Sequence, residues 1–335
     1  MHGWIITCSA GQVKALPERV IPKAIGAFGY TISRKRPAPP PREPPRLFDD
    51  PLEALHHHRG GKPAAFHCPL ESTRHRFGFD YSSSGWEPFV AALQEYEAGL
   101  ASQYPGSVLE AFYRAWQPAT AAETIAGFTA HAPPAFHRLP SHAAYVAPWR
   151  AESVAQAWEA LQEWYRRGYS RFGADFDPAV HGDKFYGPVH PELGALEYDR
   201  LTSVFASIRA SGYDRWQGDV RVIVLKRGSD MLFLKWGKGM HRTSAAVALG
   251  HDTIPATFFK SQETYFDVAD VDYWPGVRSG LWSREAAVDH VDHLFEFDSR
   301  RWAADRGLLP EQRHPAGPTA APAADRQPSL RPGSS

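Results

Sequence analysis

The sequence predicts an α/β (α+β) fold in which a small mixed sheet with flanking helices follows a mainly helical N-terminal part. Residues 220–226 and 231–236 are apolar runs rich in β-branched and aromatic residues, and the turn residues 227–230 between them complete the pattern of a hairpin. Over 85–170, apolar residues instead recur at the 3.6-residue spacing of helices. Strands and helices therefore dominate different stretches of the chain.

The helical region is clearest at 151–167, where apolar side chains occupy one face. Two more helices are predicted at 89–96 and 108–116, and Thr120 with Glu123 forms a capping box at the start of a third, short helix. The same spacing predicts elements around the hairpin: a helix over 198–211 before it, a strand over 254–260 after it, and a later helix capped by Ser283.

A glycine turn joins the hairpin to a helix. Gly237 and Gly239 allow a sharp change of direction, and residues 241–249 are good helix formers that end at Gly250. The free N–H groups and the positive dipole end of such a helix attract an anion, and His241 and Arg242 add donors there. This stretch therefore predicts a phosphate site.

The order Gly239-Met-His-Arg-Thr-Ser-Ala-Ala, then Leu249-Gly250 and Thr253-Ile-Pro255, resembles the signature of the ParB/sulfiredoxin-like superfamily. Domains of this kind occur in uncharacterised bacterial proteins. The superfamily signature is Gly-x-(His/Arg)-Arg-x-x-Ala before a Leu-Gly and an Ile-Pro strand. In its members the segment holds the phosphates of a nucleotide: CTP in chromosome-partition proteins, ATP in sulfiredoxin, and ADP or ATP in some free-amino-acid kinases.

The resemblance implies a nucleotide, ATP or CTP, bound together with Mg²⁺. The residues that it assigns to this nucleotide are Lys238, Gly239, Met240, His241, Arg242 and Thr243. Met240 departs from the family pattern, because sulfiredoxin has its reactive cysteine at that place and partition proteins have a glutamate. A thioether replaces neither, so neither chemistry is transferred to this chain.

A second stretch of interest, 181–190, is dense in side chains that ionise or donate hydrogen bonds. The resemblance brings this loop and the glycine turn to one edge of the sheet. His181 or Lys184 would then contact the terminal phosphate, and Glu197 or Asp183 would act as the base for an acceptor hydroxyl. The candidate catalytic residues are thus Glu197, Asp183 and His181, with an ordinary polar loop as the alternative.

The function that follows is phosphoryl transfer from a nucleotide to a small-molecule acceptor, or hydrolysis of the nucleotide. The alternative is a non-catalytic, nucleotide-responsive module that binds DNA or a partner protein. Against DNA stand the equal numbers of basic and acidic residues, 37 each, and the lack of a helix-turn-helix after the domain. A nuclease is a third option, but no cluster of carboxylates suits two metal ions.

Composition fits a globular cytoplasmic protein. The chain has 335 residues, of which 43% are apolar, so it can bury a sizeable core. Its two cysteines exclude a disulfide framework, no apolar run reaches the ~20 residues of a membrane span, and no targeting signal is present. The run of His56 to His58, His67, Cys68 and His75 lacks zinc-ligand spacing, and His290 with His293 fits a solvated helix face, so no metal site is predicted.

The sequence divides into five parts. They are a weakly structured segment 1–80 with a proline-rich linker at 34–46, a helical region 85–170, the ParB/sulfiredoxin-like domain 180–262, a helical extension 263–308, and a tail 309–335. The tail consists of small and polar residues with few bulky apolar ones, and is expected to be disordered and dispensable.

Overall fold

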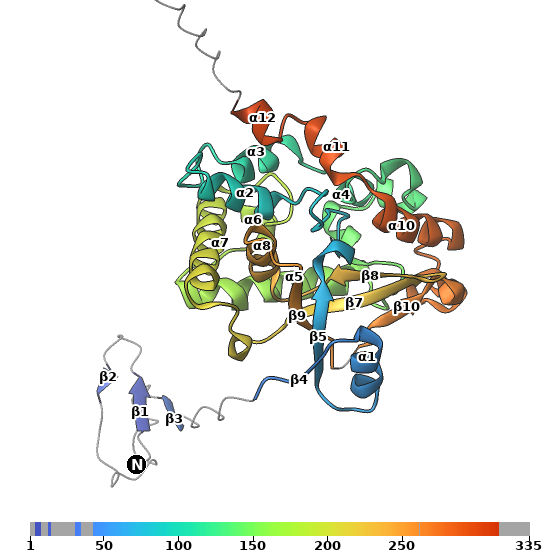
Figure 1. Ribbon diagram of the computed structural model, residues 1–335, viewed down its shortest axis with the longest axis horizontal. Helices are drawn as coiled ribbons and strands as arrows, with labels where there is room; N and C mark the ends of the chain where they lie inside the picture. Colours follow the sequence, from blue (N-terminus) through green and yellow to red (C-terminus); the bar gives the residue numbers. More distant parts are fainter. Residues whose placement is uncertain (1–3, 8–12, 15–30, 35–42, 261, 315–335) are drawn as a thin grey trace, which may run out of the picture. The chain divides into compact units, whose positions relative to one another are not determined.

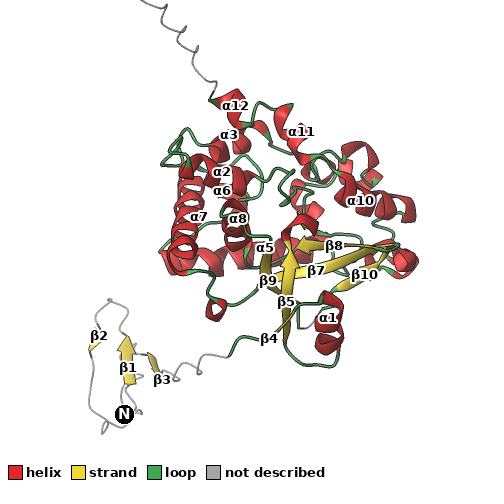
Figure 2. Cartoon of the chain, viewed as in Figure 1, coloured by secondary structure: helices red, strands yellow, loops and turns green. Residues whose placement is uncertain are grey.

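The predicted hairpin lies at the centre of the main sheet. In the computed structural model, which describes residues 4–7, 13–14, 31–34, 43–260 and 262–314, β7 (Val220–Arg227) and β8 (Asp230–Lys235) pair antiparallel around a tight turn. Their register runs from Val222 opposite Lys235 to Arg227 opposite Asp230. The hairpin prediction is confirmed, and the fold is mixed α/β (Figures 1 and 2).

The main sheet has the strand order β4-β5-β9-β7-β8-β6, with β10 pairing beside β9 on the same edge of β7. Besides the hairpin its strands are β4 (Arg46–Phe48), β5 (Ala64–Pro69), β6 (Thr73–His75), β9 (Thr253–Thr257) and β10 (Tyr265–Asp267). β6 lies parallel to β8, and its last residue, His75, is opposite Lys235. The end of β6 therefore lies directly beside the start of the glycine turn.

Both faces of the sheet are covered. Val222 and Val224 of β7 pack with α1 (Pro51–Arg59) on one face, whereas Ile223 and Leu225 pack into the larger core on the other. Figure 1 shows α1 on one side of the sheet and α7 and α8 on the other. A strand buried on both faces needs apolar residues at successive positions, which is why 220–226 is a nearly continuous apolar run.

The remaining helices form most of the larger core. The α-helices are α2 (Pro88–Glu97), α3 (Val108–Ala115), α4 (Ala121–Thr124), α5 (Val154–Tyr169), α6 (Pro178–His181), α7 (Pro191–Ser211), α8 (Met240–Ala248), α9 (Pro275–Arg278), α10 (Arg284–Glu296), α11 (Ser299–Ala304) and α12 (Pro310–Arg313). Short 3₁₀ turns are η3 (Leu70–Ser72), η4 (Thr129–His131), η5 (Pro134–His137), η6 (Ser141–Tyr145), η7 (Ser170–Phe172), η8 (Arg215–Gln217) and η9 (Val268–Tyr273). None of the helices that the structure describes is both long and apolar enough to cross a membrane.

The predicted helices are present with shifted ends. α5 begins with a capping box formed by Ser153 and Gln156 and continues through Gly168. α7 begins at Pro191, several residues before the predicted start, and ends at Gly212 as expected. α4 follows Thr120, but the Thr120 side chain accepts no capping bond; Glu123 instead accepts a 2.8 Å bond from the N–H of Ala119.

The N-terminal part differs from its predicted weak structure. Strands β1 (Trp4–Thr7), β2 (Val13–Lys14) and β3 (Thr31–Arg34) form a separate antiparallel sheet, in the order β2-β1-β3. A second compact unit begins at Pro44, so the segment up to residue 80 contributes the strands β4, β5 and β6 to the main sheet and the helix α1 beside it. These strands are short and pair with β8 and β9, far along the chain, and so leave little periodic signal. Linker residues 35–42 lie outside the described residues.

The tail also begins later than predicted. Leu309 is buried, and the Nε of Arg313 donates a 2.8 Å hydrogen bond to Oε1 of Glu95, a carboxylate that is only 2% exposed. His314 lies 3.0 Å from the same oxygen. A buried carboxylate requires such partners, which explains why α12 docks despite its polar sequence. Residues 315–335 lie outside the described part.

A chain that ends at Leu309 is therefore expected to be less stable than one that ends at His314. Removal of Arg313 and His314 leaves Glu95 with the N–H of Val108 as its remaining described partner, and loss of a charge-assisted bond costs about 1.5–3 kcal/mol. Urea unfolding of both chains measures the difference. Equal unfolding midpoints would show that the Arg313 contact contributes nothing.

Candidate functional site

The glycine turn has the geometry that the sequence predicts. Gly237 and Gly239 have φ values of +91° and +105°, which side-chain-bearing residues rarely adopt. A Cβ on Gly239 would also lie 3.1 Å from Val220, so this position requires glycine for space as well. Gly239 is the N-cap of α8, and no side chain caps it. The first N–H groups of α8 thus have no side-chain acceptor among the described residues.

Glu197 is the charged centre beneath this helix. Its Oε2 accepts hydrogen bonds from Nε2 of His241 at 3.0 Å and from Nζ of Lys184 at 3.3 Å. Its Oε1 accepts a 2.8 Å bond from the Tyr169 hydroxyl and an ion pair from Arg200. The side chain is completely buried. Glu197 therefore joins α5, α7, α8 and the loop before α7.

The electrostatics of this cluster favour a permanently ionised Glu197. Burial alone would raise the pKa of its carboxyl, but Lys184, His241 and Arg200 hold that pKa well below its usual range. Because the carboxylate only accepts, Nε2 of His241 carries the proton, and burial lowers the pKa of this imidazole in spite of Glu197. With donors on both oxygens, Glu197 is a poor general base.

The other two catalytic candidates lie apart from this centre. Asp183 is buried; it accepts a 2.6 Å bond from the Tyr145 hydroxyl and a 3.2 Å bond from that of Tyr165. Burial raises its pKa, which the two tyrosine bonds partly oppose. The ring of His181 instead contacts the backbone of Asp177 and faces a separate cavity of about 490 Å³. Asp183 also lines this cavity, so the structure places Asp183 and His181 at one cavity and pairs Glu197 with Lys184.

The residues that the resemblance assigns to phosphate have mixed environments. Met240 is buried in the core, and the Thr243 hydroxyl donates to the Gly239 carbonyl at 3.1 Å. Lys238 is exposed on the turn. Arg242 donates to the Gly218 carbonyl and, at 3.2 Å, to the Tyr213 hydroxyl. Its guanidinium therefore connects α8 to the 213–218 turn.

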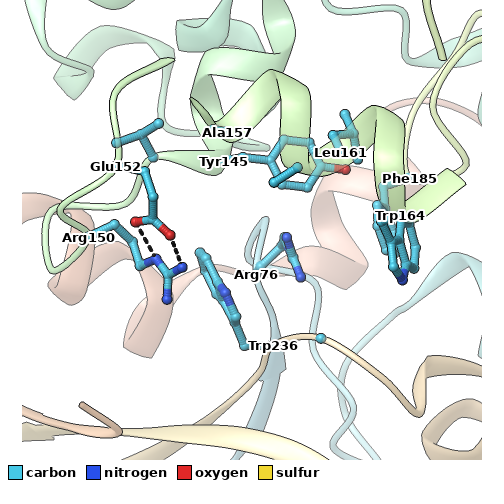
Figure 3. Close-up of a pocket in the computed structure, with 12 residues that line it drawn as sticks. Arg76, Tyr145, Arg150, Glu152, Ala157, Leu161, Trp164, Phe185 and Trp236 are labelled. Carbon is cyan, nitrogen blue, oxygen red and sulfur yellow. Dashed lines mark hydrogen bonds and ion pairs between the residues drawn. The ribbon is translucent and has the colours of Figure 1, made fainter. Parts of the chain in front are cut away.

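A pocket beside the turn contains residues that the sequence did not single out. Its cavity measures about 180 Å³. The lining residues are Arg76, Tyr145, Val146, Arg150, Glu152, Ala157, Ala160, Leu161, Trp164, Phe185, Trp236 and Gly237. Gly237 is thus a wall of the pocket as well as the first residue of the turn. Figure 3 shows Trp236 between Arg76 and Arg150, with Arg150 joined to Glu152.

Arg76 is the most distinctive group in this pocket. Its guanidinium lies 4.4 Å from the ring centroid of Trp236 and 5.0 Å from that of Tyr145. No carboxylate of the described residues forms an ion pair with it, whereas Arg74, two residues earlier, pairs with Asp80 at 2.5 Å. Aromatic faces stabilise a cation without neutralising it, so the charge of Arg76 remains available to a ligand.

More unneutralised charge lies under the turn. Nζ of Lys235 donates a 2.7 Å bond to the Gly237 carbonyl, and its side chain is 2% exposed. Burial, followed by the nearby cations Arg76, Arg242, Lys184 and Arg221, lowers the pKa of Lys235 well below its usual value. Among these neighbours only Lys184 pairs with a described carboxylate, that of Glu197. The turn is thus a local concentration of positive charge in a chain with no net charge.

No protein-family model, no curated protein and no solved structure matches this chain. Within residues 43–260 and 262–314, no three His, Cys, Asp or Glu side chains are grouped so that they could hold a metal ion. The site is therefore defined by its own geometry: a cation-rich glycine turn with an aromatic pocket on one side.

Replacement of Glu197 by Gln is expected to reduce the free energy of unfolding by about 3–5 kcal/mol, because Lys184, Arg200 and His241 lose their shared counter-charge. The depressed pKa sets the pH dependence. The contribution of the Glu197 carboxylate to the free energy of unfolding is present above the pKa of an unfolded glutamate, about 4.3. It is lost as pH falls through the lower pKa of Glu197 in the folded protein. Denaturant unfolding across this acid range should show a weaker pH slope in Glu197→Gln, with Glu163→Gln on an exposed ion pair as the control.

Replacement of Arg242 by Ala is expected to destabilise the ligand-free protein by about 1.5–3 kcal/mol, through loss of its bonds to the 213–218 turn. Thermal unfolding checks this value. A melting temperature that does not change would show that the guanidinium has no structural role and is free for a ligand.

Proposed function

We propose that the protein binds a nucleotide, with its phosphates at the glycine turn and its base in the adjacent pocket. One observation carries the proposal: Arg76, Lys235 and Arg242 converge on the turn, and none pairs with a described carboxylate. Buried charges are normally paired, so unpaired cations at an uncapped helix start favour a ligand that brings negative charge. The resemblance of the turn to the ParB/sulfiredoxin-like signature supports a polyphosphate.

The pocket beside the turn is suited to the base of the nucleotide. Trp236, Tyr145 and Phe185 offer aromatic faces, and a cavity of about 180 Å³ exceeds the ~150 Å³ that is sufficient for benzene. A single ring can therefore stack inside, while the rest of the ligand extends past Gly237. The Arg150–Glu152 pair at the rim supplies donors and acceptors for the edge of a base.

The catalytic part of the proposal is phosphoryl transfer to a small-molecule acceptor, or hydrolysis, in a cytoplasmic setting. Asp183, bonded to Tyr145 of the pocket wall, is the better candidate base, because burial raises the pKa of Asp183 whereas Lys184, His241 and Arg200 hold the pKa of Glu197 well below its usual range. The described side chains do not form a magnesium cage, so Mg²⁺ fits this site only as a companion of the nucleotide phosphates, and no step is assigned to it.

Hydrolysis separates this proposal from the non-catalytic alternative. Release of phosphate from ATP or CTP that depends on Asp183 favours an enzyme, whereas tight binding without turnover favours a nucleotide-responsive module. The balanced charge of the chain argues against DNA as the partner of such a module.

Arg76→Met is expected to weaken nucleotide binding by about 10- to 150-fold, the loss of one charge-assisted contact of ~1.5–3 kcal/mol. Stability should change little, because Met retains apolar contact with Trp236 and no described carboxylate loses its partner. Calorimetric titration with ATP, CTP and tripolyphosphate measures the affinity. Lys62→Met, which removes an exposed cation from the turn after α1, is the matched control. Equal affinities in the two variants would contradict the proposal.

A further inference from the structure

Lys235 carries a buried amine that has no acidic partner among the described residues. It ends β8 directly before the Gly237 turn, and its described polar contact is the neutral Gly237 carbonyl at 2.7 Å. Other ionisable groups face it from every neighbouring element. They are His75 and Arg76 at the end of β6, Lys184 before α7, Arg221 on β7 and Arg242 on α8.

This arrangement is unfavourable for a charged amine unless an anion is near. A carbonyl accepts one hydrogen bond but leaves the positive charge unneutralised, and the surrounding cations repel it. In agreement, burial and these cations hold the pKa of Lys235 well below its usual value. A polyphosphate bound at the turn would shift the protonation equilibrium of Lys235 toward the charged form, because each added negative charge stabilises the protonated amine.

We propose that Lys235 makes the site selective for polyanions by taking up a proton when a diphosphate or triphosphate binds over the Gly237 turn. The inference rests on the proposed function. The step is R–NH₂ + H⁺ → R–NH₃⁺, with the proton supplied by solvent, and no covalent bond to the ligand forms. A monoanion, with less charge, gains less from the same protonation, so Lys235 is a specificity residue and not a catalytic one.

The sign of the linkage follows from the geometry. In the free protein the amine loses its proton as pH rises through the lowered pKa, and a bound polyanion shifts that pKa upward. Proton uptake on binding therefore occurs between these two values and disappears on both sides. At about pH 9 the terminal phosphate of ATP and the imidazoles of His75 and His241 have finished titrating, so they do not contribute.

The test is calorimetric titration of the full chain with ATP at about pH 9, in two buffers of different ionisation enthalpy. Wild type should take up a proton. Lys235→Met should take up none and bind ATP at least about 10-fold more weakly, the equivalent of 1.4 kcal/mol, with a smaller loss for the monoanion methanesulfonate. Lys235→Arg should bind like wild type without proton uptake, because guanidinium is always charged.

Lys62→Met is the matched control, because it removes an exposed cation from the turn after α1 and should keep the proton uptake. Uptake that persists in Lys235→Met, or an equal loss of affinity for both anions, would overturn the inference alone. If wild type binds ATP without any proton uptake, the inference fails while the proposed function stands. If neither tripolyphosphate nor any nucleotide binds wild type, both fail.

Discussion

The buried carboxylate of Glu197 fixes the arrangement of the elements around the site. A fully buried charge is tolerated only when donors surround it, and here they come from α5, α7, α8 and the loop before α7. Each of these elements is therefore held at hydrogen-bond distance from a single side chain. His241 belongs to the first turn of α8, so the same carboxylate orients the helix that starts at the glycine turn. Lys184 is followed by Phe185, so it also orients one wall of the pocket.

The charge balance of this region is uneven in a way that the whole chain is not. Lys184, Arg200 and His241 share Glu197, whereas Arg76 lies against aromatic rings and Lys235 against a carbonyl. Aromatic faces and carbonyl oxygens stabilise cations by a kcal/mol or two each but do not neutralise their charge. The carboxylate of Glu197 thus holds the helices together, and a positive electrostatic potential remains at the glycine turn. An anion is the simplest complement to such a surface.

Sequence patterns predicted the hairpin, the glycine turn and α8 because each depends on residues close together in the chain. The nearly continuous apolar runs of the hairpin, the two glycines and the alanine-rich run all act within about 30 residues, where local sequence patterns are informative. The pocket could not be found in that way. Arg76 follows a strand of three residues, and only its parallel pairing with β8 brings it beside Trp236. Tyr145 is the last residue of η6, in the stretch 131–149, which contains several prolines and has no periodic apolar pattern. Pairing between short strands that lie far apart in the chain leaves no local sequence pattern. The residues that line the cavity therefore share no motif or spacing by which they could be predicted together.

Arg242 shows why structural and ligand roles need not exclude each other at this turn. Its guanidinium donates to the Gly218 carbonyl and the Tyr213 hydroxyl, which explains its fixed position. Both acceptors are neutral, so the positive charge still acts on its surroundings, and it lowers the pKa of Lys235 together with Arg76 and Arg221. A residue bound in this way holds the 213–218 turn and keeps its electrostatic effect at the start of α8. Had the partner been a carboxylate, the same bonds would have cancelled that effect. Because Lys235 and Arg242 donate to neutral acceptors, the same side chains can hold the backbone at the turn and still attract an anion to it.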